Sequence, residues 1–162
     1  MAIYIDQASG IDCLSKTCQT QLGCCVEAAK GFLKERKASK VFHCTFCIEH
    51  GKVKEVGFNC YKQKIDWHKR LGKVKFFDDK NYNMVKHAEI DAILRLGDDY
   101  DYSKTLFVNV HIDKNFACKN SKPCSNCLRV MSGLGVKRVA YFDETSNKFL
   151  VLKLKNKEKT LV

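Results

Sequence analysis

Two short stretches of the sequence carry the residue types that hydrolytic metal chemistry requires. They are His87-Ala88-Glu89 and Pro123-Cys124-Ser125-Asn126-Cys127. Catalytic zinc is typically held by three protein ligands with a fourth position open for water, and a Cys-x-x-Cys spacing lets one helix start present two thiolates to one ion. Cys124 and Cys127 meet that requirement, and His87 is the natural third ligand. We therefore expect one Zn2+ ion at these three residues.

Glu89 stands two residues after the histidine, and we expect its carboxylate to face the water rather than the ion. A carboxylate in that place can take a proton from water and then deliver protons to a ring nitrogen and to a departing amine. The residue types therefore predict hydrolytic removal of an amine from a base, with Glu89 as the catalytic residue.

The first stretch must be positioned by a helix. In NMVKHAEIDAILRLG, Asn83 is a suitable N-cap and Gly97 a suitable end, and apolar residues recur at helical spacing between them. This pattern predicts a helix with His87 and Glu89 in its first turns.

The second stretch also predicts a helix start. Pro123 is the only proline of the chain, and a proline in the first turn of a helix costs no hydrogen bond. Gly133 and Gly135 can end this helix. The apolar run TLFVNV, residues 105–110, predicts a buried strand between the two helices.

The remaining segments predict a mixed α/β domain. Helical spacing predicts a first helix from Asp12 to about Lys37, and two β-rich runs around Gly51 predict a hairpin over 41–60. Two strand-like runs joined by a polar turn at 144–147 predict a final hairpin, because no room exists there for the crossover that a parallel pair needs. This order predicts a five-stranded mixed sheet flanked by helices, with the last two strands antiparallel.

A second metal site within the first hairpin is a weaker reading. Its candidate ligands would be Cys44, Cys47, His50 and Cys60. Residues three apart on a strand point to opposite faces, so Cys44 and Cys47 cannot share an ion unless the strand breaks. We expect core or reduced surface thiols there.

The charge of the chain bears on its partners. The formal net charge of +11 favours an anionic substrate or a polyanionic partner, although lysines are often only solvated. Residues 61–86 form an insertion in which lysines alternate with Trp67, Phe76 and Phe77, a mixture that is typical of single-strand binding grooves. We expect the insertion to fold back and shape one wall of the site. A basic tail follows at 155–162.

No stretch has the length and apolar character of a membrane span or a signal peptide. We therefore expect a single domain over 1–162, located in the cytoplasm or nucleus, with its ten cysteines reduced. The sequence leaves a homo-oligomer open.

The two motifs together resemble the H-x-E and P-C-x-x-C signature of the zinc-dependent cytidine deaminase-like superfamily. The resemblance covers the motifs and the order of elements from about Val41 to Leu154, most of the chain. It implies a three-layer α/β fold and two roles in substrate binding. The backbone amide of Ala88 would meet the base carbonyl, and Asn59 would contact a sugar hydroxyl; a turn residue at a strand end is the alternative reading of Asn59.

Within that superfamily the final hairpin is similar to the cytidine and blasticidin deaminase branch and to certain polynucleotide-acting toxins. The loop over 111–122 departs from the pattern, because free-nucleoside cytidine deaminases and tRNA adenosine deaminases reach the second motif sooner. His111, Cys118 and Lys122 on this loop are candidates to line the entrance, with Cys118 also a candidate auxiliary ligand.

The leading reading is thus a deaminase that converts cytosine to uracil in free cytidine, deoxycytidine or their nucleotides. The first alternative is deamination of cytosine, or adenine, in single-stranded DNA or RNA, which the charge and the insertion favour. The second alternative is a non-catalytic binding or structural protein that keeps the fold and the zinc. Glu89 argues against that alternative, because a structural site has no use for a base.

Overall fold

The computed structural model describes residues 5–10, 16–36, 42–64 and 85–155, and the side chains of 20–36, 42–60 and 86–155. The strands are β1 (Ile5–Gly10), β2 (Phe42–Glu49), β3 (Lys52–Phe58), β4 (Cys60–Lys64), β5 (Val85–Lys86), β6 (Leu106–Ile112), β7 (Cys118–Lys119), β8 (Arg138–Asp143) and β9 (Lys148–Leu154). The helices are α1 (Lys16–Arg36), α3 (Ala88–Leu96) and α4 (Ser125–Gly133), with a 3-10 turn η2 (Tyr102–Lys104).

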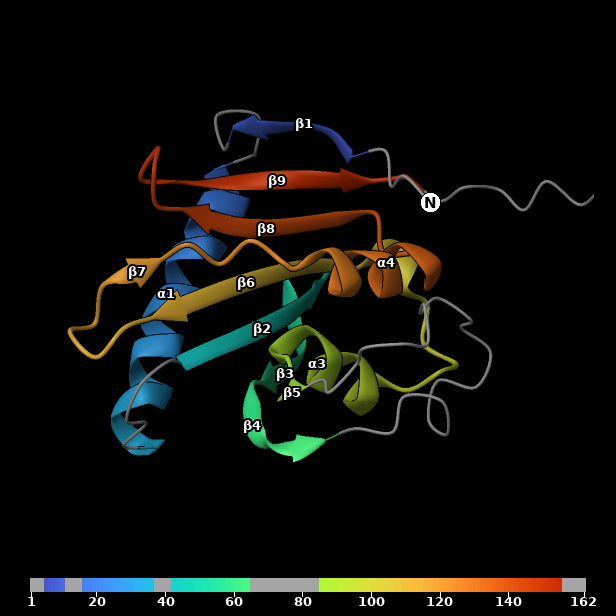
Figure 1. Ribbon diagram of the computed structural model, residues 1–162. Coiled ribbons are helices and arrows are strands. Elements are labelled where there is room, and N and C mark those ends of the chain that lie inside the picture. The colour runs from blue at the N-terminus through green and yellow to red at the C-terminus, as the bar shows by residue number, and fades with distance from the viewer. Residues whose placement is uncertain (1–4, 11–15, 37–41, 65–84, 156–162) are drawn as a thin grey trace, which may run out of the picture.

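The strands form one large mixed sheet with the order β1-β9-β8-β6-β2-β3, as Figure 1 shows. The short strand β7 pairs with β6 beside this path, and β4 pairs with β5 in a separate two-stranded sheet. Within the large sheet only β6 and β8 run parallel, while the other described pairs are antiparallel. The fold is therefore the expected mixed α/β type.

The prediction of five strands is wrong, because the sheet has six strands along its main path. The additional strand is β1, which pairs antiparallel with β9 at one edge of the sheet. Its sequence, IDQASG, is too polar to show a strand pattern, and its partner lies far away along the chain. The pairing is therefore decided by tertiary structure rather than by local sequence.

Both predicted hairpins are confirmed. β2 and β3 pair antiparallel from Cys44↔Phe58 to Glu49↔Lys52, with a bulge after Cys47. β8 and β9 pair antiparallel around the turn at 144–147, and this is the arrangement that the short connection required.

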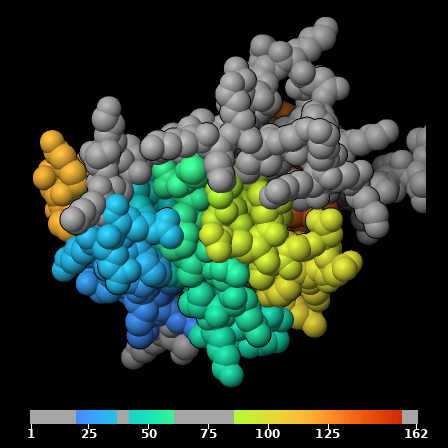
Figure 2. Space-filling model, turned by 90° about the horizontal axis from the view of Figure 1, so that it is seen from below, coloured from blue at the N-terminus to red at the C-terminus, as the bar shows by residue number. Residues whose placement is uncertain are grey.

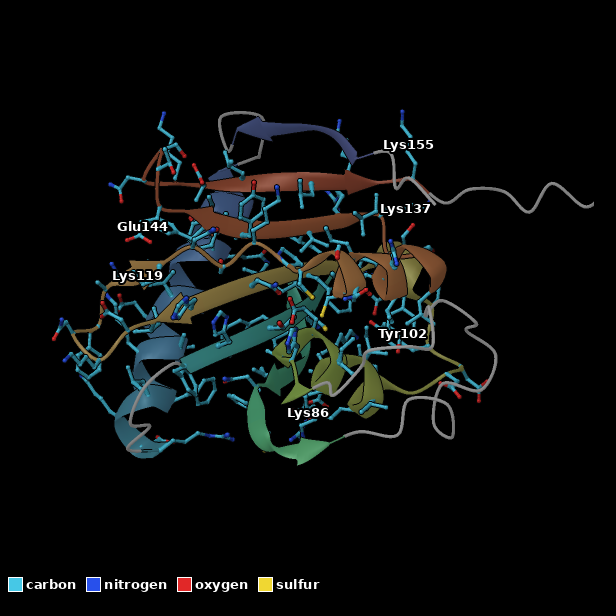
Figure 3. The ribbon with its side chains drawn as sticks, in the orientation of Figure 1. Lys86, Tyr102, Lys119, Lys137, Glu144 and Lys155 are labelled. Carbon is cyan, nitrogen blue, oxygen red and sulfur yellow. The ribbon has the colours of Figure 1, made fainter. Side chains whose placement is uncertain are left out.

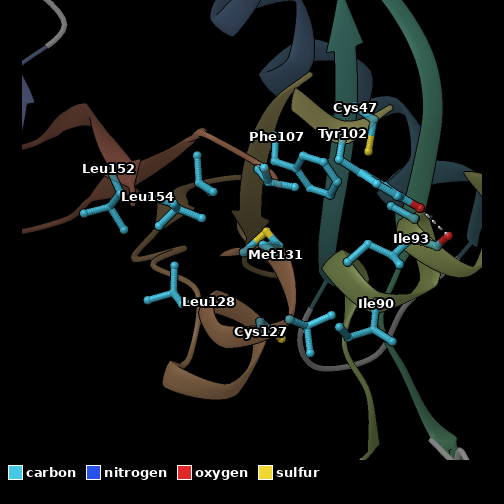
Figure 4. Packing of buried hydrophobic residues seen from close by; sticks show 14 of the residues in the cluster. Cys47, Ile90, Ile93, Tyr102, Phe107, Cys127, Leu128, Met131, Leu152 and Leu154 are labelled. Carbon is cyan, nitrogen blue, oxygen red and sulfur yellow. Dashed lines mark hydrogen bonds between the residues drawn. The ribbon is translucent and has the colours of Figure 1, made fainter. Parts of the chain in front are cut away.

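Helices cover both faces of the sheet. On one face α1 packs against alternate residues of β2 and β6, with this buried set: Leu22, Cys25, Ala29, Leu33, Phe42, Cys44, Phe46, Ile48, Leu106, Val108, Val110 and Ile112. On the other face α3 and α4 cover a second core, drawn in Figure 4, that includes Cys47, Ile90, Ile93, Tyr102, Phe107, Cys127, Leu128, Met131, Leu152 and Leu154. The hydroxyl of Tyr102 closes this second core by donating to the carbonyl oxygens of Ile93 and Gly97.

Three cross-strand pairs between β2 and β6 lie on the α3–α4 face, and they change character along the strands. Cys47 pairs with Phe107 inside the apolar core, Thr45 pairs with Asn109, and His43 pairs with His111. The two imidazoles are stacked, with ring centroids 4.0 Å apart. The same sheet face therefore turns from apolar to polar toward the start of β2 and the end of β3, where the candidate site lies.

The start of α3 differs from the prediction. The helix begins at Ala88 with His87 as its N-cap, because Val85–Lys86 forms strand β5 against β4. Asn83, the predicted cap, lies outside the described residues, as do 65–84 of the insertion and 156–162 of the tail. β4 and β5 are thus the described ends of the insertion.

α3 is held closely against β3 at Gly57. A Cβ atom at Gly57 would lie 2.1 Å from the Ala88 carbonyl oxygen and 2.3 Å from the Ala92 amide nitrogen, so only glycine fits here. Asp91 adds a polar link, because its carboxylate accepts from the Phe58 amide and from Arg95 and pairs with Lys86. Figure 2 shows this side of the molecule, with α3 in yellow-green beside the teal and green residues of the β2–β3 hairpin and α1 in blue beyond.

No helix among the described residues is long and apolar enough to cross a membrane.

Candidate metal centre

Cys124 stands at the N-terminal end of α4 and is its N-cap. Its sulfur accepts a hydrogen bond from the Cys127 amide at 3.5 Å, which is the bond that a capping side chain makes to the third residue of a helix. Pro123 therefore lies just before the helix rather than in its first turn, which corrects the predicted boundary. Because the cap and Cys127 are three residues apart, their two sulfurs face the same side of the helix start.

His87 closes the group from the other helix. Its Nδ1 atom lies 3.6 Å from Sγ of Cys124 and 3.4 Å from Sγ of Cys127. The three ligand atoms all lie within 4.8 Å of one another. Tetrahedral zinc with its usual bond lengths places a sulfur and a nitrogen ligand about 3.5 Å apart. The three predicted ligands therefore come together with the spacing that a metal ion requires.

The electrostatics of the group also suit a cation. Hydrogen bonds from Cys127 and from His87 lower the pKa of Cys124 to about 4 against the effect of burial. The hydrogen bond to Cys124, together with burial, raises the pKa of Cys127 well above its usual range. The hydrogen bond with Cys124 raises the pKa of His87. One thiolate is thus already present at neutral pH, and a cation would replace the protons that the group shares.

Glu89 lies in the first turn of α3 and is only 7% exposed. Burial raises the pKa of its carboxyl. Its Oε1 atom accepts a hydrogen bond of 2.7 Å from Nδ2 of Asn109, and its carboxyl lies near the Cys127 side chain. The predicted catalytic residue is therefore beside the metal group and is held by protein partners.

A pocket opens onto these residues. Its lining residues come from the ends of β2 and β3, from the starts of α3 and α4, and from the loop before α4: His43, Asn59, Lys86, His87, Ala88, Glu89, Ser121, Lys122 and Cys124. Lys86 lies on β5 at the lower side of the view in Figure 3. The pocket wall thus combines the metal ligands, the carboxylate and two lysines.

The two residues assigned to substrate binding by resemblance both line this pocket. Ala88 is the first residue of α3 and is 2% exposed. Asn59 follows β3, and it is tied to β2 by two bonds: its amide donates to the His43 carbonyl, and its Oδ1 accepts from the His43 amide. Asn59 can therefore be both a structural residue at the end of β3 and a residue of the pocket wall.

Other predicted candidates lie elsewhere. Cys44 and Cys47 are buried in opposite cores, and burial raises the pKa of both thiols. His50 is exposed at the hairpin turn. Within the described part of the chain, the only group of three or more metal-ligating side chains is that of His87, Cys124 and Cys127, so Cys118 is not an auxiliary member of it.

Strand pairing, hydrogen bonds and an ion pair hold the lengthened loop over 111–122 in place. β7 pairs with β6, the Asp113 carboxylate accepts from the amides of Asn115 and Ala117, and Lys119 forms an ion pair with Glu144, both labelled in Figure 3. Of the three candidates proposed for the entrance, only Lys122 lines the pocket, while His111 stacks behind His43. The loop therefore shapes the site through its last residues.

The sequence interpretation missed Thr45, Asn109 and Ser121, which join Glu89 in a buried hydrogen-bonded network. The available signal was the presence of a threonine and an asparagine inside two otherwise apolar strand sequences. A buried polar side chain needs a hydrogen-bond partner, and here the Thr45 hydroxyl donates to Oδ1 of Asn109.

Comparison of the chain with protein-family models, with curated proteins and with solved structures found no match. The molecule is thus characterised by its own geometry, as a mixed α/β fold that brings a histidine and two cysteines together as a group able to hold a metal ion.

Proposed function

We propose that this protein is a zinc-dependent hydrolytic deaminase that converts cytosine to uracil in a free cytidine or deoxycytidine nucleoside or nucleotide. One observation carries the proposal: a buried carboxylate, Glu89, shares one pocket wall with His87 and Cys124 of the metal group. Two helix starts and a parallel strand pair create this arrangement, and the sequence motifs there resemble those of the cytidine deaminase-like superfamily.

The donor set supports zinc in a catalytic role. Two thiolates and an imidazole suit zinc, and three protein ligands are the usual number in catalytic sites, whereas structural sites use four. Among the described residues no fourth ligand joins the group. When bound there, zinc supplies Lewis acidity and lowers the pKa of a water molecule.

The residues of the chain account for the remaining steps. Glu89 accepts the proton of the attacking water and passes protons to the ring nitrogen and to the amine, which departs as ammonia while a carbonyl replaces it. Ala88 and Asn59 both line the pocket, and in this proposal the Ala88 amide holds the carbonyl oxygen of the base and Asn59 contacts a sugar hydroxyl. Burial of Glu89 suits this cycle, because it raises the pKa of the carboxyl and so makes it a better proton acceptor than an exposed carboxyl.

The decisive experiment incubates the protein with a panel of nucleosides, nucleotides and single-stranded oligonucleotides and measures product mass. Exchange of an amine for a carbonyl raises the mass by about one dalton. Gain of this mass by a cytosine compound is the expected result. No mass gain with any member of the panel, for a protein that carries about one zinc per chain, would refute the deaminase proposal and would leave the binding or structural alternative.

A matched pair of variants tests the mechanism. Glu89→Gln keeps the size of the side chain and an oxygen that can accept from Asn109, but it cannot carry a proton. We expect turnover to fall by at least about 100-fold while zinc content is retained. Glu144→Gln, an exposed residue outside the pocket, should leave turnover unchanged. Full activity of Glu89→Gln would contradict the assigned role.

A second candidate function is deamination of a base within single-stranded DNA or RNA. The observation that favours it is the pair of lysines at the pocket, Lys86 and Lys122, in a chain with a net charge of +11. The oligonucleotide members of the same panel decide between the two substrates, since each reaction product is identified by its own mass.

A further inference from the structure

Asn109 lies in the middle of β6 and is 4% exposed, and its carboxamide makes three hydrogen bonds. Oδ1 accepts from the Thr45 hydroxyl at 2.8 Å. Nδ2 donates to Oε1 of Glu89 at 2.7 Å and to the Ser121 carbonyl oxygen at 3.3 Å. Every donor and acceptor that the side chain needs is therefore supplied by the protein.

The partners determine which way the amide faces. The Ser121 carbonyl can accept a hydrogen bond but cannot donate one, and the same is true of an ionised Glu89 carboxylate. Both N–H groups of Asn109 must therefore point at these two acceptors. A rotation by 180° would place Oδ1 against these acceptors and would leave the Thr45 hydroxyl facing an N–H group. The amide thus has one satisfied orientation, which these two acceptors select, and the Thr45 hydroxyl on β2 then donates to its Oδ1.

Ser121 links the same network to the second metal-ligand helix. Its hydroxyl donates to the Asn109 carbonyl at 2.7 Å and accepts from the Phe142 amide at 2.8 Å. Its own amide donates to the Phe142 carbonyl. Ser121 stands three residues before Cys124, so the loop that presents the metal ligand is fixed to β6 and β8 next to Asn109.

Burial of this polar network inside the sheet costs desolvation free energy. Thr45 and Ser121 are 0% and 2% exposed, and the neighbouring rung of the same sheet face is the apolar pair Cys47 and Phe107. Two aliphatic side chains could occupy the positions of the cross-strand pair Thr45 and Asn109 without removing polar groups from water. The polar choice is explained if the network serves the carboxylate that it contacts.

We propose that Asn109 is a positioning residue for Glu89, supported by Thr45, whose hydroxyl donates to the buried Oδ1 of the same amide. This inference rests on the proposed function, in which Glu89 carries protons. Asn109 binds one carboxylate oxygen at 2.7 Å, and Glu89 lines the pocket together with His87 and Cys124, so this bond fixes the direction of the carboxylate beside the metal group. A rigidly placed proton carrier contributes to rate because small displacements of a reacting group are expensive.

Three variants test whether Asn109 positions Glu89 or only links β2 to β6. Asn109→Leu removes the donor to Glu89 at similar volume. Thr45→Val is isosteric and removes only the hydroxyl that donates to Oδ1 of Asn109, which leaves that buried oxygen without this partner. Thr45→Ser is the matched control, because it keeps that hydroxyl. All three are examined as full-length, zinc-loaded protein, with zinc content and unfolding measured first.

With the cytosine compound identified by the panel, we expect Asn109→Leu to lower kcat by about 100-fold and Thr45→Val by about 10-fold, with KM changed by less than about threefold. Thr45→Ser should stay within about twofold of the natural protein. Retention of kcat by folded, zinc-loaded Asn109→Leu would overturn the proposal, as would equal effects of Thr45→Val and Thr45→Ser.

Crystal structures of the same variants give a readout that does not depend on turnover. We expect the Glu89 carboxylate to leave its present direction in Asn109→Leu and to remain in place in Thr45→Ser. An unmoved carboxylate in Asn109→Leu overturns the positioning role. If Asn109→Leu does not fold, Thr45→Val decides, because an unmoved amide and carboxylate with unchanged kcat would reject the proposal. Absence of turnover in the natural protein refutes the proposed function and leaves the structural test of positioning intact.

Discussion

The sulfur of Cys124 both caps α4 and lies among the candidate metal ligands, because its position directly before the helix gives it access to both. Amide donors at a helix start stabilise a thiolate, and they do so before any metal arrives. The hydrogen bonds from the Cys127 and His87 side chains are the larger causes of the low pKa of Cys124, about 4, and the Cys127 amide adds to them. The capping geometry thus prepares the ligand for a cation.

Replacement of this sulfur tests the metal assignment. Cys124→Ser keeps an oxygen that can cap α4 but removes a soft ligand, so we expect zinc content to fall from about one per chain by at least about tenfold. Metal analysis after dialysis measures this. Cys24→Ser, at an exposed cysteine of α1, is the control and should retain full zinc. Equal zinc content in the two variants would remove Cys124 from the ligand set.

At this scale the sequence predicted the metal group, Glu89 and the two pocket residues by motif, since local spacing around two helix starts determines where they point. It did not predict Thr45, Asn109 or Ser121. Their contacts depend on the register between β2 and β6, which pairs Thr45 with Asn109, and no local pattern specifies that register.

Among the elements, α3 has the closest contact with the sheet, and Gly57 makes that contact. Because His87 and Glu89 stand at the start of α3, the fit of this helix on β3 sets where both side chains lie relative to α4. A substitution at Gly57 therefore reaches the site although the residue has no side chain of its own.

Gly57→Ala should be strongly destabilising. Its Cβ would meet backbone atoms of α3 that cannot move alone, so we expect a loss of about 1–3 kcal/mol or more in the free energy of unfolding, together with weaker zinc retention. Urea denaturation measures the first effect. Gly23→Ala, in α1 with nothing within 4 Å of the new Cβ, is the control and should be neutral or stabilising by up to about 1 kcal/mol. Equal stability of the two variants would show that α3 can shift freely on β3.

The predicted elements succeed and fail for physical reasons. The final hairpin was predictable, because a short polar turn permits only antiparallel pairing. β1 was not, because its polar sequence depends on β9 for its conformation. The start of α3 was placed too early, because Val85–Lys86 continues the helical pattern in sequence yet pairs with β4 in the fold.

For the molecule as a whole, acid should reduce stability through His43. Burial, reinforced by His111 and His87, lowers the pKa of His43 from 6.5 to about 4. Between pH 6.5 and pH 4, His43 binds a proton in the unfolded chain but not in the folded chain. Its contribution to the free energy of unfolding is therefore fully present above pH 6.5 and is lost as the pH falls to 4.

His43→Phe keeps a ring to stack on His111 but cannot titrate. From pH 7 to pH 4 we expect the natural protein to lose roughly 2–3 kcal/mol more unfolding free energy than the variant. Denaturant unfolding at a series of pH values measures the difference. Parallel pH profiles for the two proteins would show that His43 is protonated as readily in the fold as in the unfolded chain.

The pairing of β1 with β9 also constrains how the molecule is made. Ile5 pairs with Leu154, so β1 has its partner roughly 150 residues later in the chain. During translation the β2–β3 hairpin can form early from neighbouring residues, but the outer edge of the sheet has to wait until β9 has left the ribosome. Until then β8 lacks its neighbour on the β9 side, and the nascent chain exposes a strand edge that can pair with other chains. Among the described strands, the edge formed by β1 and β9 is therefore completed only after β2, β3, β6 and β8 have been synthesised.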